Sequence, residues 1–585
     1  GYKQNDLTRE NIAWIVRNGQ LIPTNTTYDR EDCATGCQVT SGTFANSQFF
    51  LEYRPLTETT KLFSVNPGLD WEVSDRLKLS IQANYTRSTF HREIPTAGPV
   101  TAMGTGVSVD YTANANGAPS IVSSVDLNDP NNFVWNGGRV NMSDERRRNE
   151  TKGVRGALTW GDERFNLQVG GNYDDVSRRI RGFDNSQAWQ NAVCGGNPNV
   201  FVPGPNSQPP CVGAASVAPG TPGYPTYPGY GTGSTAGQSG PVSYGGSLIP
   251  VGQLPSFLMP GRAGFVTVDW DRFKQASNYD SFHENTPESG GSNTGASGGL
   301  IREKSFATYF MAAGKQQVGD NDLRFNVGVR YVKTDQTIEG RVSLADPRNT
   351  LPDGSSLPDG SRYPSIVTLV RTSNSYDKWL PAATVAYDIG DLAVVRAAYS
   401  KTMTRPDPAA QLPGVGFGDP SAATATIGNP ALNPYFSDNL DFGVELYTGQ
   451  EGLVSLNAFR KSLTGFTTNQ ITTQPFSFLA QYGITYDSLN PTQAAAIDLR
   501  GGPSVATIQV QSQVNVPNKL TVNGLEFQWI QPLDFLTESI GVRGFGFNAN
   551  ATIVDQRSDG PAVAFGVAPF TYNLIGYYEN GGVNL

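Results

Sequence analysis

The sequence predicts an all-β fold, a transmembrane antiparallel β-barrel, from its alternation of apolar and polar residues, its connection lengths and its composition. Charged residues make up 16% of the 585 residues, while Gly reaches 65 and Pro 39. This charged share is low beside the roughly 25% of typical globular chains, and the mix suits many strands joined by turns. No run of about 18 apolar residues occurs, so the sequence offers no transmembrane helix.

Alternation is the strongest signal. Period two places the apolar members of a segment on one face of a strand, and a tilted strand crosses a membrane in about ten residues. Alternating segments lie at 77–86, 165–173, 323–331, 439–446, 525–529 and 545–552. The residues expected to face lipid include Leu77, Leu79, Phe165, Leu167, Phe442, Val444, Phe545 and Phe547.

Short and long connections alternate along the chain. Short turns are expected at 74–75, 161–163, 319–321, 389–391, 449–452 and 579–582, with a longer one at 531–540. Long loops are expected at 89–150, 176–300, 335–375, 405–435, 467–518 and 557–568. A soluble sandwich has no reason for this order, whereas a membrane barrel has short periplasmic turns and long extracellular loops.

The expected organisation is a barrel domain over 1–585 that is incomplete at both ends. About fifteen strands are expected, and bacterial barrels close with an even number. The chain opens without a secretory signal, so preceding sequence is expected to be missing. The loop 176–300 is rich in Gly, Pro and Ser, and 185–261 contains no charged residue. A net charge of −9 and a pI near 5.0 argue against a nucleic-acid partner.

The cysteines form two local pairs, Cys33 with Cys37 and Cys194 with Cys211. An even number of cysteines in loop-like sequence favours disulfides and an oxidising compartment. A metal site is the alternative, but no histidine lies near either pair in the sequence. We therefore expect two extracellular disulfides.

No catalytic constellation is present. His91 and His283 lie far apart in loop-like sequence, and neither is expected to have a role. Residues 295–299 match the nucleophile-elbow pattern G-x-S-x-G, but that motif needs a preceding strand and a following helix. Two turns explain the Pro-Asp-Gly repeat at Asp353 and Asp359, with weak calcium binding as the alternative. We expect no enzyme activity, no metal site and no cofactor.

Aromatic residues of the long loops are the candidates for solute binding, because aromatic faces suit sugar rings and other flat surfaces. Packing of the loops against one another is the alternative role. The candidates are Trp135, Trp189, Tyr224, Tyr227, Tyr230, Phe257 and Tyr279.

Two arginine triplets flank the strands that share the turn at 161–163. They are Arg146, Arg147 and Arg148, and Arg178, Arg179 and Arg181. Counting outward from the turn places Arg147 opposite about Arg178, so the triplets should meet at the outer rim. Like charges placed opposite one another are unfavourable, so an anion should compensate them. Neighbouring carboxylates, lipopolysaccharide phosphates and an anionic solute are the alternatives.

The second half of the chain resembles one family. Residues 376–382 (Y-D-K-W-L-P-A) and 395–407 (V-R-A-A-Y-S-K-T-M-T-R-P-D) resemble the W-L-P … R-x-x-Y-S-x-x-x-x-R-P segment of TonB-dependent outer-membrane receptors. Residues 428–443 resemble that family's G-N-P-x-L-x-P-x-x-S-x-N-x-D-x-G run, and 522–526 its x-x-G-x-E strand. The resemblance is dense over 375–585 and thinner before it. The large loops resemble the proteobacterial branch.

The resemblance implies a 22-stranded barrel around an N-terminal plug, with a TonB box facing the periplasm. Neither plug nor box is present in this sequence, so no functional residue of the family is carried over. The implied function is TonB-dependent import of an oligosaccharide, siderophore or similar nutrient across the bacterial outer membrane. The implied partners are TonB, the small-molecule nutrient, and outer-membrane lipid and lipopolysaccharide. The alternatives are a passive porin and a structural or adhesive surface barrel.

Overall fold

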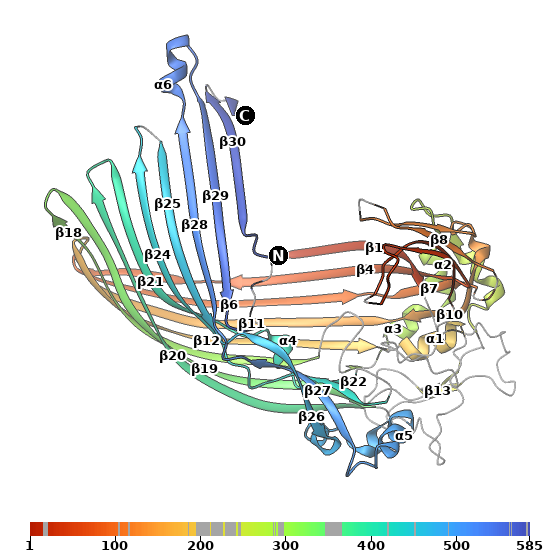
Figure 1. Ribbon diagram of the computed structural model, residues 1–585. Coiled ribbons are helices and arrows are strands. Elements are labelled where there is room, and N and C mark those ends of the chain that lie inside the picture. The colour runs from red at the N-terminus through yellow and green to blue at the C-terminus, as the bar shows by residue number, and fades with distance from the viewer. Residues whose placement is uncertain are drawn as a thin grey trace.

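One large curved antiparallel sheet dominates the computed structural model (Figure 1). The structure describes residues 1–585 apart from 16–20, 35, 103, 105, 115–116, 185, 195–210, 212–225, 229–240, 244–246, 285, 287, 290–297, 345–365, 418–420, 450–451, 490, 561, 563, 565, 581–582 and 585. Within the described residues, no helix has the length and apolar character needed to cross a membrane.

The sheet extends into the long connections through β7 (Thr96–Thr101), β10 (Phe133–Asn141) and β17 (Glu288–Ser289), and we call the rest of it the wall. The wall is a meander in which, apart from the pair β4 and β5, each strand pairs antiparallel with the next wall strand. Its strands are β1 (Tyr2–Ile15), β4 (Gln48–Val65), β5 (Gly68–Ser74), β6 (Leu77–Glu93), β11 (Ser143–Gly161), β12 (Phe165–Asp184), β18 (Gly299–Val318), β19 (Asn321–Leu344), β20 (Ile366–Ile389), β21 (Ala393–Thr404), β24 (Tyr435–Tyr447), β25 (Leu453–Thr464), β28 (Leu520–Pro532), β29 (Phe545–Ser558), β30 (Phe570–Asn580) and the short β31 (Val583–Asn584). β4 and β5 both pair with β6, so they act as one strand interrupted at Asn66 and Pro67.

The connection pattern predicted from the sequence is confirmed. The predicted short turns at 74–75, 161–163, 319–321 and 389–391 join consecutive wall strands. Those at 449–452 and 579–582 lie partly outside the described residues, and the strands that flank them pair with each other. The predicted longer turn at 531–540 runs from the end of β28 toward β29 and carries α6 (Asp534–Thr537) and η6 (Glu538–Ile540). The long connections gather at the other end of the wall (Figure 1). We call this end the outer end.

The prediction of strand length was wrong for much of the wall. β19 and β20 each run for 24 residues, and β11 and β12 for 19 and 20. Beyond the width of a membrane, pairing with a neighbouring strand still satisfies the backbone, but no lipid demands alternation. The arginine triplets and His91 therefore lie in strands, where the sequence suggested loops.

The long connections are also more structured than expected. The first group of outer elements comprises β2 (Ile22–Tyr28), β3 (Val39–Ala45), β7 (Thr96–Thr101), β8 (Val109–Thr112), β9 (Ser120–Ser123), η1 (Pro130–Asn132), β10 (Phe133–Asn141), α1 (Ser186–Cys194), β13 (Thr226–Pro228), β14 (Pro241–Ser243), η2 (Val251–Phe257), β15 (Leu258–Met259), β16 (Thr267–Val268), α2 (Trp270–Ala276), α3 (Tyr279–Glu284) and β17 (Glu288–Ser289). The second comprises α4 (Pro408–Gln411), β22 (Val415–Phe417), β23 (Thr424–Ile427), β26 (Thr467–Pro475), η4 (Phe476–Tyr482), η5 (Tyr486–Ser488), α5 (Pro491–Leu499) and β27 (Thr507–Asn515).

Each group has a hydrophobic core of its own. The first core centres on Trp135, Trp189 and Phe273, and the second contains Phe476, Leu479 and Ile497. These apolar residues are spread through Gly- and Pro-rich sequence without a helix or strand period. Only tertiary contacts bring them together, which is why the sequence suggested irregular loops.

Candidate functional site

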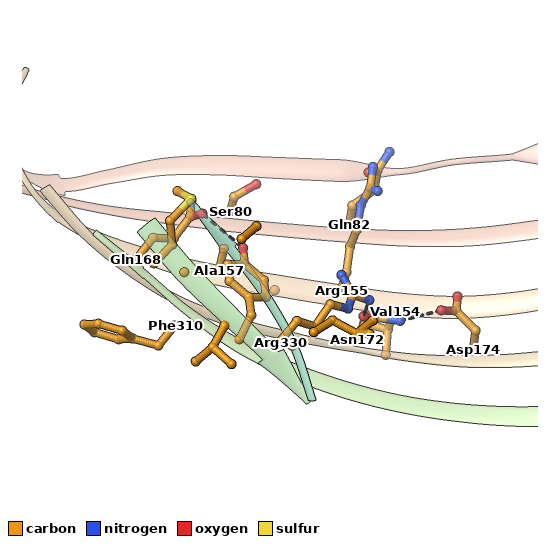
Figure 2. A pocket seen from close by; sticks show the side chains of 18 of the residues that line it. Ser80, Gln82, Val154, Arg155, Ala157, Gln168, Asn172, Asp174, Phe310 and Arg330 are labelled. Atoms are coloured by element: carbon orange, nitrogen blue, oxygen red, sulfur yellow. Dashed lines mark hydrogen bonds between the residues drawn. The ribbon is translucent and has the colours of Figure 1, made fainter. Parts of the chain in front are cut away.

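A polar cavity of about 1080 Å³ lies against the wall, between β6 and β20 (Figure 2). Its polar lining comes from alternate positions of neighbouring strands. The strands contribute Ser80, Gln82, Asn84, Arg155, Gln168, Asn172, Asp174, Tyr309, Asn326 and Arg330, and Asn66 comes from the interruption between β4 and β5. Because directly paired residues share a face of a sheet, the ladders extend this face, which we call the cavity face, across the wall.

The ladders place the predicted apolar residues on the opposite face. Gln82 pairs with Arg155 and Arg155 with Asn172 on the cavity face. Farther along, Ala382 of the cavity pairs with Ser400, and Ser400 with Asn439. All eight residues predicted to face lipid are an odd number of positions away from the cavity-face residues of their own strands, so they lie on the opposite face. Among them, Phe165, Phe442 and Phe545 are 43%, 52% and 43% exposed. The prediction that these eight residues share one face of the wall is confirmed, and that face is opposite the cavity face.

Hydrogen bonds between side chains order the cavity lining. Arg330 Nη2 donates to Asn172 Oδ1 at 2.6 Å, and Asn172 Nδ2 donates to Asp174 Oδ2 at 2.5 Å. Tyr309 donates to Gln168 Oε1 at 3.1 Å, and Gln168 Nε2 donates to Thr159 Oγ1 at 3.0 Å. The lining is therefore an organised polar surface of amides and hydroxyls, together with the charged side chains of Arg155, Asp174 and Arg330. Sequence reasoning used these residues only as the polar half of the strand pattern.

Glycine makes room within this lining. A Cβ at Gly153 would collide with Asn84 Oδ1 and Asp174 Oδ1, which belong to the two neighbouring strands. A Cβ at Gly170 would meet the Tyr309 ring at 2.7 Å. These two glycines allow the polar side chains of adjacent strands to lie across the backbone.

The arginine triplets do meet, although two positions away from the predicted register. Arg146 pairs with Arg181 and Arg148 with Arg179, whereas Arg147 is opposite Ile180. The predicted opposition of Arg147 and Arg178 was therefore wrong, because β12 begins only at Phe165, so the turn is longer than the counting assumed. By parity, Arg147 and Arg178 lie on the cavity face and the other four on the opposite face.

Carboxylates compensate four of the six arginines. Arg148 lies 2.8 Å from Glu150, Arg181 lies 2.8 Å from Glu288, and Arg146 lies 3.5 Å from Asp144. Arg147 pairs with Glu145. Within the described residues, Arg178 and Arg179 have no carboxylate within ion-pair distance. Binding of lipopolysaccharide phosphate by the exposed Arg179 remains a prediction, as does binding of an anionic solute by Arg178 on the cavity face.

The aromatic candidates with described side chains pack the first outer core. Trp135, Trp189 and Tyr279 are 0% exposed and Phe257 is 8% exposed. The Trp135 indole donates to the Ile249 carbonyl at 2.9 Å, and the Trp189 indole to the Ser277 carbonyl at 3.1 Å. This geometry is that of packing residues, and no open ring face is left for a solute.

The remaining loop candidates are not placed by the structure. Tyr224 and Tyr230 lie outside the described residues, as do Asp353 and Asp359. Tyr227 lies in β13, where its backbone pairs with Val242, and its side chain is outside the described part. A solute-binding role for these tyrosines and weak calcium binding by the two aspartates remain predictions.

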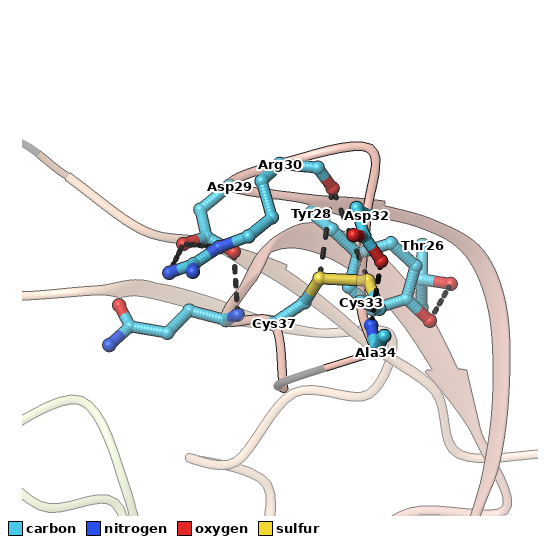
Figure 3. The surroundings of a disulfide bond; sticks show 9 residues. Thr26, Tyr28, Asp29, Arg30, Asp32, Cys33, Ala34 and Cys37 are labelled. Atoms are coloured by element: carbon cyan, nitrogen blue, oxygen red, sulfur yellow. Dashed lines mark hydrogen bonds and ion pairs between the residues drawn. A yellow bond between two sulfur atoms is a disulfide. The ribbon is translucent and has the colours of Figure 1, made fainter.

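Both predicted disulfides are present. Cys33–Cys37 closes the connection between β2 and β3, next to Asp29, which accepts a hydrogen bond from the Gln38 backbone at 2.7 Å (Figure 3). Cys194–Cys211 links the end of α1 to a residue whose backbone bonds to Gly138 of β10 at 2.8 Å. Both lie at the outer end.

A cluster of two histidines and one aspartate was missed by the sequence analysis. His91 of β6 and His283 of α3 each place Nε2 2.9 Å from Asp144 Oδ2, near the outer end of β11. Burial disfavours charge on Asp144, but hydrogen bonds from His283 and His91 outweigh it, and the pKa of the carboxyl is below its ordinary value. Burial likewise opposes the charge of His283, yet its bond to Asp144 raises the pKa of the imidazole. The rarity of histidine in this chain was the only available sequence signal.

Comparison with known proteins finds one family model. Residues 214–585, more than half of the chain, match the model described as TonB dependent receptor-like, beta-barrel. No curated protein sequence matches the chain.

Several solved structures are similar at low identity. One is the alcaligin outer-membrane receptor FauA from Bordetella pertussis (9% identity, 93% of this chain, 64% of that chain, TM-score 0.34). Another is the ferripyoverdine receptor of the Pseudomonas aeruginosa outer membrane (10%, 99%, 58%, TM-score 0.37). A third is the ferric citrate transporter FecA (9%, 99%, 62%, TM-score 0.36). The chain spans less than two thirds of the length of these three structures.

Proposed function

Because the chain belongs to the TonB dependent receptor-like β-barrel family, we propose that it forms the wall of an energised importer of a scarce nutrient. This family is one of outer-membrane receptors and transporters, not of enzymes. The proposed location is therefore the bacterial outer membrane, with the apolar face against lipid and the cavity face lining the lumen. A charged or amide-rich face would be costly against hydrocarbon, so only this orientation suits a membrane.

The observation that carries the proposal is the polar cavity on a wall whose other face is apolar. Lumen-facing side chains bind or guide the solute, while the long outer elements enclose its entry. In this mechanism TonB acts on a plug within the lumen and draws on the inner-membrane proton gradient. The wall itself performs no covalent chemistry.

The cavity lining favours a neutral, hydroxyl-rich solute such as an oligosaccharide. Gln82, Gln168 and Asn172 offer amides, and Tyr309 a hydroxyl, as paired donors and acceptors. The Arg155 guanidinium donates a hydrogen bond to the Gln82 amide, and the Arg330 guanidinium donates one to the Asn172 amide, so each has a neutral partner. Sugar hydroxyls both donate and accept, which suits such a surface.

Uptake of labelled oligosaccharides by cells that express the complete gene tests this proposal. Uptake should require TonB. Asn172→Ala should reduce it about tenfold, the effect of losing roughly 1–2 kcal/mol of hydrogen bonding. Val169→Leu, on the opposite face of the same strand, is the matched control and should leave uptake unchanged.

Other outcomes would contradict the proposal. Uptake that is equal without TonB would indicate a passive porin. A surface barrel that adheres to other cells and imports none of the solutes would indicate a structural or adhesive role. Uptake of ferric siderophores but not of oligosaccharides would leave energised import intact and overturn the solute class.

A further inference from the structure

The chain contains two histidines in 585 residues, and both contact one carboxylate. They come from distant segments: His91 lies on the wall, whereas His283 lies on a helix of the long connection between β12 and β18. Asp144, which both contact, is 2% exposed. The convergence of the only two imidazoles on a buried carboxylate singles this cluster out.

The three side chains have the geometry of a metal site. Their ligand atoms all lie within 4.8 Å of one another, and each Nε2 is 2.9 Å from Asp144 Oδ2. Around a tetrahedral Zn²⁺ with bonds near 2.0 Å, neighbouring ligand atoms lie about 3.3 Å apart. A small outward shift of each group would therefore admit an ion.

The carboxylate is poorly satisfied by the hydrogen bonds it accepts. Both imidazoles contact the same oxygen, Oδ2, while Asp144 Oδ1 is buried and has no hydrogen-bond partner within the described residues. A buried acceptor without a partner costs about 1–3 kcal/mol. Coordination of a cation by this carboxylate would reduce that cost. A purely structural role for the two histidines does not explain why the Oδ1 atom is buried without a partner.

The surroundings hold the ligands in place and leave a route of entry. Tyr279 stacks on His283 with ring centroids 5.4 Å apart and donates a hydrogen bond to Glu93 Oε1 at 2.7 Å. Glu93 Oε2 lies 3.9 Å from His283 Nε2, within reach of a fourth position. The His91 side chain is 37% exposed, so an ion can enter past it.

One neighbouring charge opposes a cation. The Arg146 guanidinium lies 3.5 Å from Asp144 Oδ2, but its side chain is 57% exposed and also stacks on Phe183 at 4.9 Å. It can turn toward solvent without uncovering a core. Asp144 and Glu93 together supply two negative charges against this one positive charge.

We propose that His91, Asp144 and His283 bind one divalent transition-metal ion of the zinc type, with Glu93 or water as the fourth ligand. Two imidazole nitrogens and a carboxylate oxygen suit Zn²⁺ better than Ca²⁺ or Mg²⁺, which prefer oxygen alone. The ion ties α3 of the long connection to β6 and β11 of the wall. This site is independent of the solute-binding cavity and of the proposed import.

Zinc titration of the full chain in detergent, after treatment with a chelator, tests the site. Wild type should bind one Zn²⁺ per chain. His91→Gln should weaken this binding more than about 100-fold, which exceeds the loss expected from altering a residue that only hydrogen-bonds to a metal ligand. Asp175→Asn is the matched control. It removes a carboxylate of β12 that pairs with Arg302 of β18, away from the three proposed ligands. This variant should retain wild-type zinc affinity.

A second measurement separates metal binding from damage to the fold. Zinc should slow trypsin cleavage at Lys274, next to α3, in wild type and in Asp175→Asn, but not in His91→Gln or His283→Ala. The melting temperatures of the zinc-free variants should stay near that of wild type, because His91 is on a strand and partly exposed. Absence of saturable zinc binding by wild type, or wild-type zinc affinity in a double variant that combines His91→Gln with His283→Ala, would overturn the proposal.

Discussion

Phe442→Arg tests the assignment of the two faces of the wall. Phe442 is 52% exposed, and its cross-strand partners are Ala397 and Ala458, so it lies on an apolar surface. It stands five residues before Tyr447, where β24 ends at the short turn. With about 3.3 Å per residue and a tilt near 40°, that places it roughly 13 Å from the turn end.

This height is close to the middle of the hydrocarbon layer, since the apolar band of such barrels is about 25 Å tall. A guanidinium there should cost about 2–4 kcal/mol of folding free energy. The neighbouring residue provides the control: Asp441 is at almost the same height on the cavity face and is exposed. Asp441→Arg should change the folding free energy by less than about 1 kcal/mol, because it stays in water.

The measurement is reversible unfolding by denaturant of the complete protein in lipid vesicles, with refolding yield as a second readout. Phe442→Arg should lower the midpoint while the slope with denaturant stays constant. If Asp441→Arg destabilises as much as Phe442→Arg, or if Phe442→Arg has no effect, the assignment of lumen and lipid faces is wrong.

Three further predictions concern packing and crosslinks. Removing the Cys194–Cys211 disulfide with serine at both positions should destabilise the outer elements by about 3 kcal/mol, seen as faster limited proteolysis, because the crosslink closes a 17-residue separation. Trp135→Ala, which deletes a fully buried indole, should cost about 3–5 kcal/mol in thermal unfolding of the first outer core; an unchanged transition would contradict its packing role. Gly524→Val should cost about 1–3 kcal/mol because the Phe459 ring covers that glycine, and a second substitution, Phe459→Leu, should restore most of the loss if the contact is responsible.

The strands of the wall and their faces could be predicted from the sequence alone. Alternation at positions such as Phe442 and Val444 fixes which residues share a face, because side chains in a strand have a period of two whatever the neighbouring strands are. The alternation of short turns with long connections then sets the strand order, since each short turn forces its two strands to be neighbours. The two disulfides were also predictable, because each joins cysteines close in sequence.

The outer end and the histidine cluster depend on contacts between segments far apart in the sequence. Strand pairing continues past the predicted limits because a neighbouring backbone, not hydrophobic alternation, sustains it there. Trp135 and Trp189, candidates for solute binding in the sequence, are enclosed by segments more than 50 residues away. His91, Asp144 and His283 meet only because α3 folds back onto β6 and β11. No local pattern encodes such a contact: the three residues come from separate elements, and their convergence depends on how the long connection packs against the wall.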